Sequence, residues 1–348
     1  MMAGRRHYAR QSGYVLVLNI CVLALLMLGA TYMGQRMDAA VSMVRAERER
    51  LDQDEQIAAA RAEVMFMLAT TPRTRFGLGV DPRAVVPDGR LYRVGDNAAV
   101  AFQDVRGLIS LNGIGLSGSG REPLERLLGT YGLDAEASGR LVDALLDYRD
   151  ADSLRRLNGA EREDYSAAGR QADLRNNDLK VPNELARVYG WSDVDALWGD
   201  DPITGYVSVH VRPVLNPNTA NWRVLMALSG LSKEAVQALL VSRQRGEIQD
   251  VTPLVAPGLS SDPFSGGPAV VKAPSDELIV TFYARGGRSG LRLDVLHSPE
   301  SAYAPWKIRY AERVPAPAQL KGWEDLPRLP AAASLAEWQR ANAVQLPF

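Results

Sequence analysis

The sequence predicts an α+β chain in which a long N-terminal helix precedes a small antiparallel sheet, and a large helical insertion interrupts that sheet. Three observations carry the prediction. An apolar N-terminal stretch passes without proline into a second helical pattern. Alternating apolar and polar residues on both sides of the body predict strands, and leucines at helical spacing fill the middle of the chain.

The N-terminal segment is predicted to cross a membrane. Residues 14–33 carry no charged side chain, and a helix of that length spans ~30 Å, the hydrocarbon thickness of a bilayer. Arg5, Arg6 and Arg10 precede the segment without any acidic residue, which predicts a cytoplasmic N-terminus and a body on the other side. A cleaved secretory signal is the competing interpretation, but its apolar core is usually only ~7–15 residues long.

Two side chains between Tyr14 and Met33 bear on this segment. Asn19 is polar, and a polar group in hydrocarbon is costly unless it is paired, so the residue indicates either a partner helix or a tolerated amide. Cys21 is the one cysteine of the chain, which excludes an intrachain disulfide and any paired-cysteine metal or redox site.

The helical pattern continues beyond the membrane segment. Residues 36–70 contain no proline, and a single helix over 14–70 is therefore predicted. Such a rod suits packing against copies or relatives of the chain, and a coiled-coil anchor at a surface is the alternative. The apolar stripe recurs every seven residues at Val44, Leu51, Ala58 and Met65.

The body is predicted to hold strands around a helical middle. Segments that begin at Glu125 and Arg223 form a weak repeat of helical hairpins, with chance similarity as the alternative. Strands are predicted at 91–94, 98–105, 206–214, 278–284, 291–295 and 306–310. The predicted domains are a basic leader at 1–13, a transmembrane and amphipathic helix at 14–70, first β elements at 71–106 and 205–214, a helical insertion at 107–255 interrupted by the 205–214 strand, an antiparallel meander at 256–313 and a Pro-rich tail at 314–348. The tail is predicted to be mobile, apart from one short helix capped by Ser334 and Glu337.

Composition argues against two function classes. The chain carries 40 Lys+Arg against 41 Asp+Glu, which gives no support for a nucleic-acid binder. His210 and His297 have no nucleophile at a known motif spacing and are predicted to lie on the surface, so no catalytic residue is predicted. The glycines of residues 113–120 resemble a phosphate loop, but no Gly-Lys-Ser/Thr follows, which favours a flexible linker.

Residues 216–243 also resemble helix-hairpin-helix DNA-binding modules, including membrane-tethered DNA-uptake receptors. Such a module holds phosphate on the backbone N–H groups of a Gly-rich hairpin. The hairpin here, residues 229–232, contains one glycine and no basic patch surrounds it. A protein–protein role is favoured, and DNA binding or uptake stays as the alternative function.

Carboxylates cluster most densely after the second predicted helix of the body. Calcium takes six to eight oxygen ligands, so this cluster is a candidate calcium site, although its spacing does not fit an EF-hand. Pairing of these acids with the five arginines between Arg140 and Arg162 is the alternative. The candidate ligands are Asp147, Asp150, Asp152, Glu161 and Asp164.

Four segments give the chain a family resemblance. They occur in the family's order over most of residues 10–312, and the chain resembles the minor pseudopilin K family of type II secretion systems. The segments are RQSG ending at Gly13, LLDYRDAD at 145–152 followed by NGAEREDY at 158–165, VPNELARVYG at 181–190, and LNPNTANWRVLMALSGLS at 215–232.

The resemblance implies a pilin-like fold whose insertion holds two SAM-like helix-hairpin units. It implies cleavage by the prepilin peptidase after Gly13, with Tyr14 as the methylated first residue of the mature chain. Most pilin-like proteins have glutamate at the fifth mature position, the K subunit lacks it, and this chain has Leu18 there. A subunit without that docking charge suits the end of a stack better than its interior.

The implied function is to cap the tip of a periplasmic pseudopilus and help initiate its assembly for secretion across the outer membrane. The implied partners are the minor pseudopilins I and J, the prepilin peptidase and the bacterial inner membrane, crossed once. Members of the family are described with bound calcium, which supports the acidic cluster as a site. The resemblance implies no catalysis, and neither a nucleic acid nor a small-molecule substrate is expected.

Overall fold

The structure is a computed structural model, and it divides the chain into two units, Met1–Glu55 and Gln56–Phe348, each described by itself. The leader with Gly13 lies outside the described residues, and so do the predicted capping residues Ser334 and Glu337. The described residues are 14–71, 73–74, 77–79, 84–115, 120–170, 174–211, 214–246, 248, 269–298 and 301–330.

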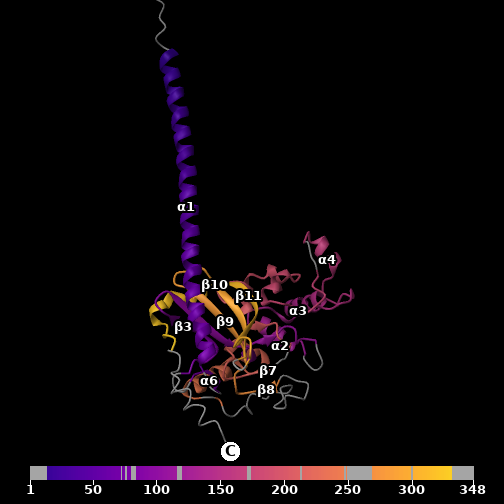
Figure 1. Ribbon diagram of the computed structural model, residues 1–348. Helices are drawn as coiled ribbons and strands as arrows, with labels where there is room; N and C mark the ends of the chain where they lie inside the picture. Colours follow the sequence, from indigo (N-terminus) through magenta and orange to yellow (C-terminus); the bar gives the residue numbers. More distant parts are fainter. Residues whose placement is uncertain are drawn as a thin grey trace, which may run out of the picture. The chain divides into compact units, whose positions relative to one another are not determined.

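Helix α1 (Tyr14–Thr70) is continuous in Figure 1 and begins and ends where the sequence pattern changes. Within the first unit its side chains are exposed to solvent or half-exposed. Within the second unit one stripe of the helix is buried, at positions three to four residues apart as one helical face requires. That stripe consists of Ile57, Ala60, Val64, Met65, Met67 and Leu68.

A five-stranded antiparallel sheet forms the centre of the second unit, in the order β11-β10-β9-β4-β3. Strand β4 pairs with β9 from Ala98↔Ala284 to Asp104↔Leu278, so residues 105–276 leave the sheet and return to it at one point. The α+β fold with a large insertion is thereby confirmed. The strands are β3 (Asp88–Val94), β4 (Ala98–Asp104), β9 (Glu277–Ala284), β10 (Ser289–His297) and β11 (Trp306–Pro315).

One face of this sheet packs against the buried stripe of α1. The contact is apolar, and its side chains form one cluster with the end of the helix. Burial of this face follows from the strict alternation of the strands, because residues two apart point to the same side. The strand residues include Val100, Phe102, Leu278, Val280, Phe282, Leu293 and Val295.

The insertion has its own apolar core and contains two helical hairpins. In each hairpin the second helix begins at a capping side chain, Asp134 before α3 and Ser232 before α6. Its elements are η1 (Val105–Gly107), β5 (Ile109–Ser110), α2 (Glu122–Gly129), α3 (Ala135–Arg149), α4 (Arg162–Ala167), η2 (Pro182–Arg187), η3 (Trp191–Asp193), η4 (Asp195–Leu197), η5 (Ile203–Gly205), β6 (Val207–Ser208), β7 (Val214–Leu215), α5 (Trp222–Ser229), α6 (Lys233–Arg245) and β8 (Ala269–Val270).

The predicted strand at 206–214 is wrong in extent. Only Val207 and Ser208 pair in β6, in parallel with β5, and β7 pairs in parallel with β8, so neither joins the main sheet. The alternation of this segment does not mark a half-exposed strand, because Ser208 on its polar side is buried as well.

The prediction of a mobile tail from 314 onward is also wrong for its described part. Residues 318–325 form η7 (Ala318–Asp325), and Trp323 is buried against the sheet. Beyond it Arg93 of β3 donates its N–H to Pro327 O at 2.7 Å, and Leu329 donates to Arg93 O at 2.8 Å. A further short pair, β1 (Arg73–Thr74) with β2 (Gly77–Leu78), is antiparallel.

Candidate functional site

The four residues predicted within the membrane helix all lie on α1 with exposed side chains. These are Tyr14, Asn19, Cys21 and Met33. The helix contains a window of mean hydropathy 2.3 in which no residue is buried, so it is long and apolar enough to cross a membrane. Cys21 is a free cysteine on this exposed surface.

The candidate calcium ligands lie between the end of α3 and the start of α4, and arginine binds two of them. Asp147, in the last turn of α3, is 0% exposed. Its carboxylate accepts the backbone N–H of Arg156 at 3.1 Å and the guanidinium of the same residue at 2.5 Å. Asp150, at the end of α3, accepts that guanidinium as well, at 2.5 Å. Arg156 therefore lies between the two carboxylates where a cation would bind.

The other three carboxylates cap turns of the same loop. Asp152 accepts the N–H of Leu154 at 2.8 Å. Glu161 and Asp164 form a capping box at the start of α4, in which Asp164 accepts the N–H of Glu161 at 2.9 Å. Asp164 also pairs with Arg155 at 3.0 Å. The structure thus brings all five predicted residues together around one loop. Most of their hydrogen bonds are to backbone N–H groups and arginines of that loop.

Two buried carboxylate oxygens of this loop accept no hydrogen bond from the described residues. They are Glu161 Oε1 and Asp150 Oδ1. Burial, and then the charges of the neighbouring carboxylates, raise the pKa of Glu161. Burial also raises the pKa of Asp147, and the bonds from Arg156 oppose that effect. Within the described ranges, no group of three or more His, Cys, Asp or Glu is placed to hold a metal.

The glycine and tyrosine of the following motif have steric and packing roles. Gly159 passes so close to Asp147 that a Cβ on it would lie 1.8 Å from Asp147 Oδ2, so only glycine fits there. Tyr165 on α4 is buried, its hydroxyl accepts the N–H of Tyr189 at 2.8 Å, and the two rings meet edge to face. The second and third segments of the family resemblance therefore contact each other in the fold.

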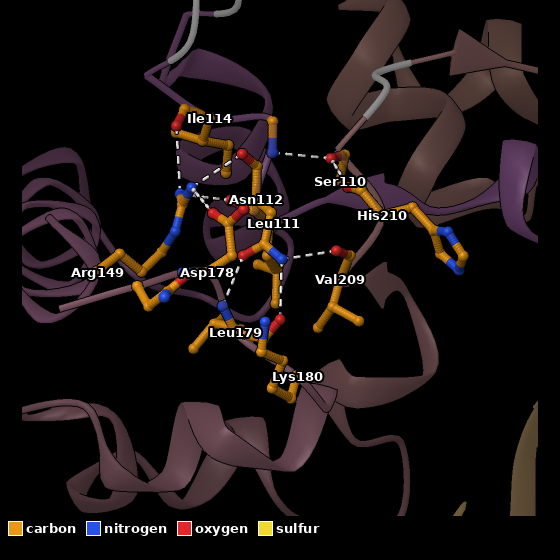
Figure 2. A network of polar contacts seen from close by, with 12 residues as sticks. Ser110, Leu111, Asn112, Ile114, Arg149, Asp178, Leu179, Lys180, Val209 and His210 are labelled. Atoms are coloured by element: carbon orange, nitrogen blue, oxygen red, sulfur yellow. Dashed lines mark hydrogen bonds and ion pairs between the residues drawn. The ribbon is translucent and has the colours of Figure 1, made fainter. Parts of the chain in front are cut away.

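A buried polar network joins α3 to the loop after β5 (Figure 2). Arg149 ends α3, and its side chain donates to Leu111 O at 2.7 Å and Asn112 O at 2.8 Å. It also reaches Ile114 O at 3.2 Å and pairs with Asp178 at 3.1 Å. One guanidinium thus satisfies three backbone carbonyls of a tight turn. The sequence contained Arg149 within a motif but offered no sign of these partners.

Asn112 extends this network to two further segments. Its amide N–H₂ donates to Leu179 O at 2.9 Å and to Val209 O at 2.6 Å, and its oxygen accepts the N–H of Leu179 at 3.0 Å (Figure 2). Ser110 Oγ accepts the N–H of Gly113 at 2.9 Å and donates to His210 O. Residues 113–115 of the predicted flexible linker at 113–120 are therefore part of a fixed turn.

Asp104 fastens the insertion to the end of β4. Its buried carboxylate accepts hydrogen bonds from the N–H of Ser275 at 2.9 Å, Thr219 Oγ1 at 2.8 Å and the Asn216 amide at 3.0 Å. It also accepts the N–H of Arg106 at 3.1 Å. Asn216 and Thr219 belong to the fourth segment of the family resemblance, so that segment holds the two ends and the middle of the insertion together.

His210 lies buried between the insertion and the sheet, so its predicted surface position is wrong. Its side chain is 8% exposed. Its Nδ1 lies 2.9 Å from Glu277 Oε2 on β9, and its Nε2 lies 3.1 Å from Asp294 Oδ2 on β10. Arg309 on β11 also pairs with Glu277. The cluster combines two cations with two anions.

The charges of this cluster shift two titrations in opposite directions. Burial disfavours the charged imidazole, but the hydrogen bonds and charges of Asp294 and Glu277 outweigh it and raise the pKa of His210 to about 9. The hydrogen bond from His210 is the main cause that lowers the pKa of Glu277 to about 2. Both groups are therefore ionised at neutral pH, which makes the cluster a buried ion-pair network.

His297 is also buried, contrary to the prediction. Its Nε2 lies 2.6 Å from Leu68 O, one of the last carbonyls of α1. The last four carbonyls of a helix lack partners within it, so His297 caps this end of α1. Both histidines therefore have structural contacts.

Comparisons with known proteins agree with this architecture. Residues 107–196 match the family described as type II secretion system (T2SS), protein K. A chain of the crystal structure of the GspK-GspI-GspJ complex from the enterotoxigenic Escherichia coli type 2 secretion system is similar, with a TM-score of 0.52 and 15% identity over 78% of this chain and 99% of that chain. At that identity the likeness shows the fold. No curated protein matches.

The matched residues 107–196 contain the acidic loop, the Arg149 network and the Tyr165–Tyr189 contact. The pilin-like sheet and α1 lie outside them, and the structural likeness covers most of the chain. Residues 107–196 thus match the type II secretion system protein K family, and the likeness over most of the chain shows a fold similar to that of the solved GspK-GspI-GspJ chain.

Proposed function

We propose that this chain is a minor pseudopilin of the type II secretion system protein K family, and that it caps the tip of a pseudopilus and helps initiate its assembly. The observation that carries the proposal is the insertion between β4 and β9, residues 105–276, nearly half of the chain. It adds a second apolar core and its own surface to a pilin-like sheet, which a repeating fibre subunit does not need. Leu18 supports the same position, because it supplies no charge for docking within a stack.

The proposed partners are the minor pseudopilins I and J, since the similar solved chain belongs to a GspK-GspI-GspJ complex. Co-expression of this chain with the I and J subunits of its own secretion system tests the proposal. The expected result is a complex of all three that survives gel filtration. Failure to assemble with and without added calcium would reject the partnership. A chain whose β4–β9 connection is replaced by a short turn should lose assembly initiation in a secretion assay.

We also propose cleavage by the prepilin peptidase after Gly13, N-methylation of Tyr14, and an orientation with a cytoplasmic N-terminus and periplasmic body. Arg5, Arg6 and Arg10 support the orientation, since basic residues stay on the cytoplasmic side. The intact mass of the membrane-extracted chain should match residues 14–348 with one added methyl group. An intact leader would contradict this proposal, and a Gly13→Val variant should retain the leader.

Calcium binding to the acidic loop is proposed only with displacement of Arg156. The unused oxygens of Glu161 and Asp150 support it, whereas the guanidinium of Arg156 occupies the position between Asp147 and Asp150. With Arg156 in place the five carboxylates do not form a calcium site. Calorimetric titration with calcium chloride should therefore show tighter binding by Arg156→Gln than by the unchanged chain. No binding by either protein would reject calcium for this loop.

A further inference from the structure

The side of the sheet that faces the insertion is only partly covered. A cleft of about 1060 Å³ lies between this side of the sheet, the loop at 200–207 and the segment at 315–327. All of its lining belongs to the second unit. Its floor comes from β3, β4, β9, β10 and β11 and includes Tyr283 and Tyr310, and its walls include Tyr206, Trp222, Pro202 and Pro317.

Three hydrogen-bond donors in this lining are unused. The hydroxyls of Tyr283 and Tyr310 and the indole N–H of Trp222 have no hydrogen-bond partner among the described residues. Other aromatic donors in the insertion are satisfied, since Trp191 donates to Leu141 O at 2.9 Å and Trp198 donates to Trp191 O at 2.8 Å. None of the three donors is among the fully buried unpaired atoms, so each is open to the water of the cleft and is available to an acceptor on a ligand.

The charges of the cleft favour a basic ligand. Its two cations are already paired, Arg292 with Glu312 at 3.2 Å and Arg90 with Asp88 at 2.6 Å. Asp200 at the rim is exposed and makes no ion pair within the part of the chain that the structure describes. The cleft therefore offers donors along its floor and walls and an uncompensated carboxylate at its rim.

We propose that this cleft binds an extended, proline-containing segment of a partner protein that carries a basic residue. A polyproline II segment has no internal hydrogen bonds, so its carbonyls are free acceptors, and proline brings no N–H that would need an acceptor of its own. Aromatic-lined grooves with Tyr and Trp donors recognise such segments in other domains. The basic residue pairs with Asp200. This inference does not depend on the proposed position at a pseudopilus tip.

Fluorescence anisotropy of the full chain in detergent tests the proposal. The probe is a fluorescein-labelled peptide of prolines and leucines with one arginine, and the reference is a glycine–serine peptide of the same length with one arginine. The proline peptide should bind and the reference should not. Trp222→Phe and Tyr310→Phe each keep an aromatic ring and remove one donor, and each should weaken binding about three- to tenfold. Tyr303→Phe, in the exposed β10–β11 turn, is the matched control and should change nothing.

The rim contact has a separate readout. Asp200→Asn should weaken binding of the arginine peptide about two- to fivefold and leave a peptide with leucine in place of arginine unaffected. The thermal unfolding midpoint of each variant confirms that it is folded. Absence of binding by the proline peptide, equal binding of the glycine–serine peptide, or binding unchanged in Trp222→Phe and Tyr310→Phe would each overturn the proposal. If Asp200→Asn changed the binding of both peptides equally, the proposed pairing of a basic ligand residue with Asp200 would be wrong.

Discussion

The two faces of the five-stranded sheet are covered by different means. The face toward α1 is apolar apart from His297, and Phe102, Val280 and Phe282 are fully inaccessible there. The face toward the insertion carries polar and charged groups, including the buried Arg292 and Asp294, and it leaves a cleft. An apolar contact accepts many combinations of side chains, whereas buried charges need specific partners. The insertion therefore depends on particular residues, and α1 on an apolar pattern.

The largest effect is expected on the apolar face. Phe282→Ala should destabilise the second unit by about 3–5 kcal/mol, because it removes a buried ring and leaves a cavity between α1 and the sheet. Denaturant unfolding of the detergent-solubilised chain measures this. Phe66→Ala, at a residue of α1 that is 63% exposed, is the matched control and should change stability by less than about 0.5 kcal/mol. Similar losses of stability in both variants would show that burial of this apolar face does not hold α1 against the sheet.

On the insertion-facing side, stability should depend on pH through His210. Its raised pKa of about 9 means that its stabilisation is complete below its ordinary pKa of 6.5 and is lost as pH rises through 9. The whole contribution is about 3 kcal/mol. The lowered pKa of Glu277, about 2, means that its share is complete above 4.5 and is lost as pH falls through 2. Thermal midpoints should thus be highest between about pH 4.5 and 6.5 as far as this cluster decides them.

The control for this pH dependence is His210→Gln, which cannot ionise. Its thermal midpoint should be lower near neutral pH, and the decline between pH 7 and 10 should flatten. If the thermal midpoint of the variant fell just as steeply between pH 7 and 10, the decline would come from other titratable groups. The ion-pair network would then not distinguish the two faces of the sheet.

An intermediate effect is expected where the insertion joins the sheet. Asp104→Asn keeps the size of the side chain but cannot accept from all four donors, and should cost about 1–3 kcal/mol. Hydrogen exchange should increase at Ser275 and Thr219 more than at the centre of β9, because the connection loosens before the sheet. Uniform exchange across the second unit would instead mean that insertion and sheet unfold as one cooperative body.

The smallest effect on stability is expected at an uncharged polar residue of the sheet face that is turned toward the insertion. Thr281 lines the cleft on the insertion-facing side and has no charged partner among the described residues. Thr281→Val replaces its hydroxyl with a methyl group and should change the free energy of unfolding by less than about 0.5 kcal/mol. A loss of about 2 kcal/mol or more would contradict the view that only the charged clusters of this face are specific.

The sequence predicted those parts of the fold that depend on local periodicity. The strands that contain Val100 and Val280 are short apolar runs, and the hairpins carry their own capping residues, so neighbours along the chain decide both. Periodicity failed at residues 206–214, because Ser208 and His210 are covered from a second direction by the sheet and the β5 loop. In the sequence, a polar residue that is buried and bonded to distant partners cannot be distinguished from one that is exposed to water.

The acidic loop shows the same limit at the candidate site. The sequence placed Asp147 and Asp150 together with three other carboxylates and offered calcium or arginine as partners. The structure gives both to Arg156, nine residues after Asp147, and makes capping groups of the others. The steric reason for Gly159 could not be inferred either, since it depends on how closely the returning loop approaches α3.

The sequence by itself determined the membrane-length helix, the apolar face of the sheet, the two hairpins and the family segments, because each is written in residues close together along the chain. Only the tertiary structure decided that β4 and β9 are neighbours across residues 105–276, that His210 is an internal cation, and that three aromatic donors share one cleft. These features join residues far apart along the chain, and such pairings follow from packing rather than from any local pattern.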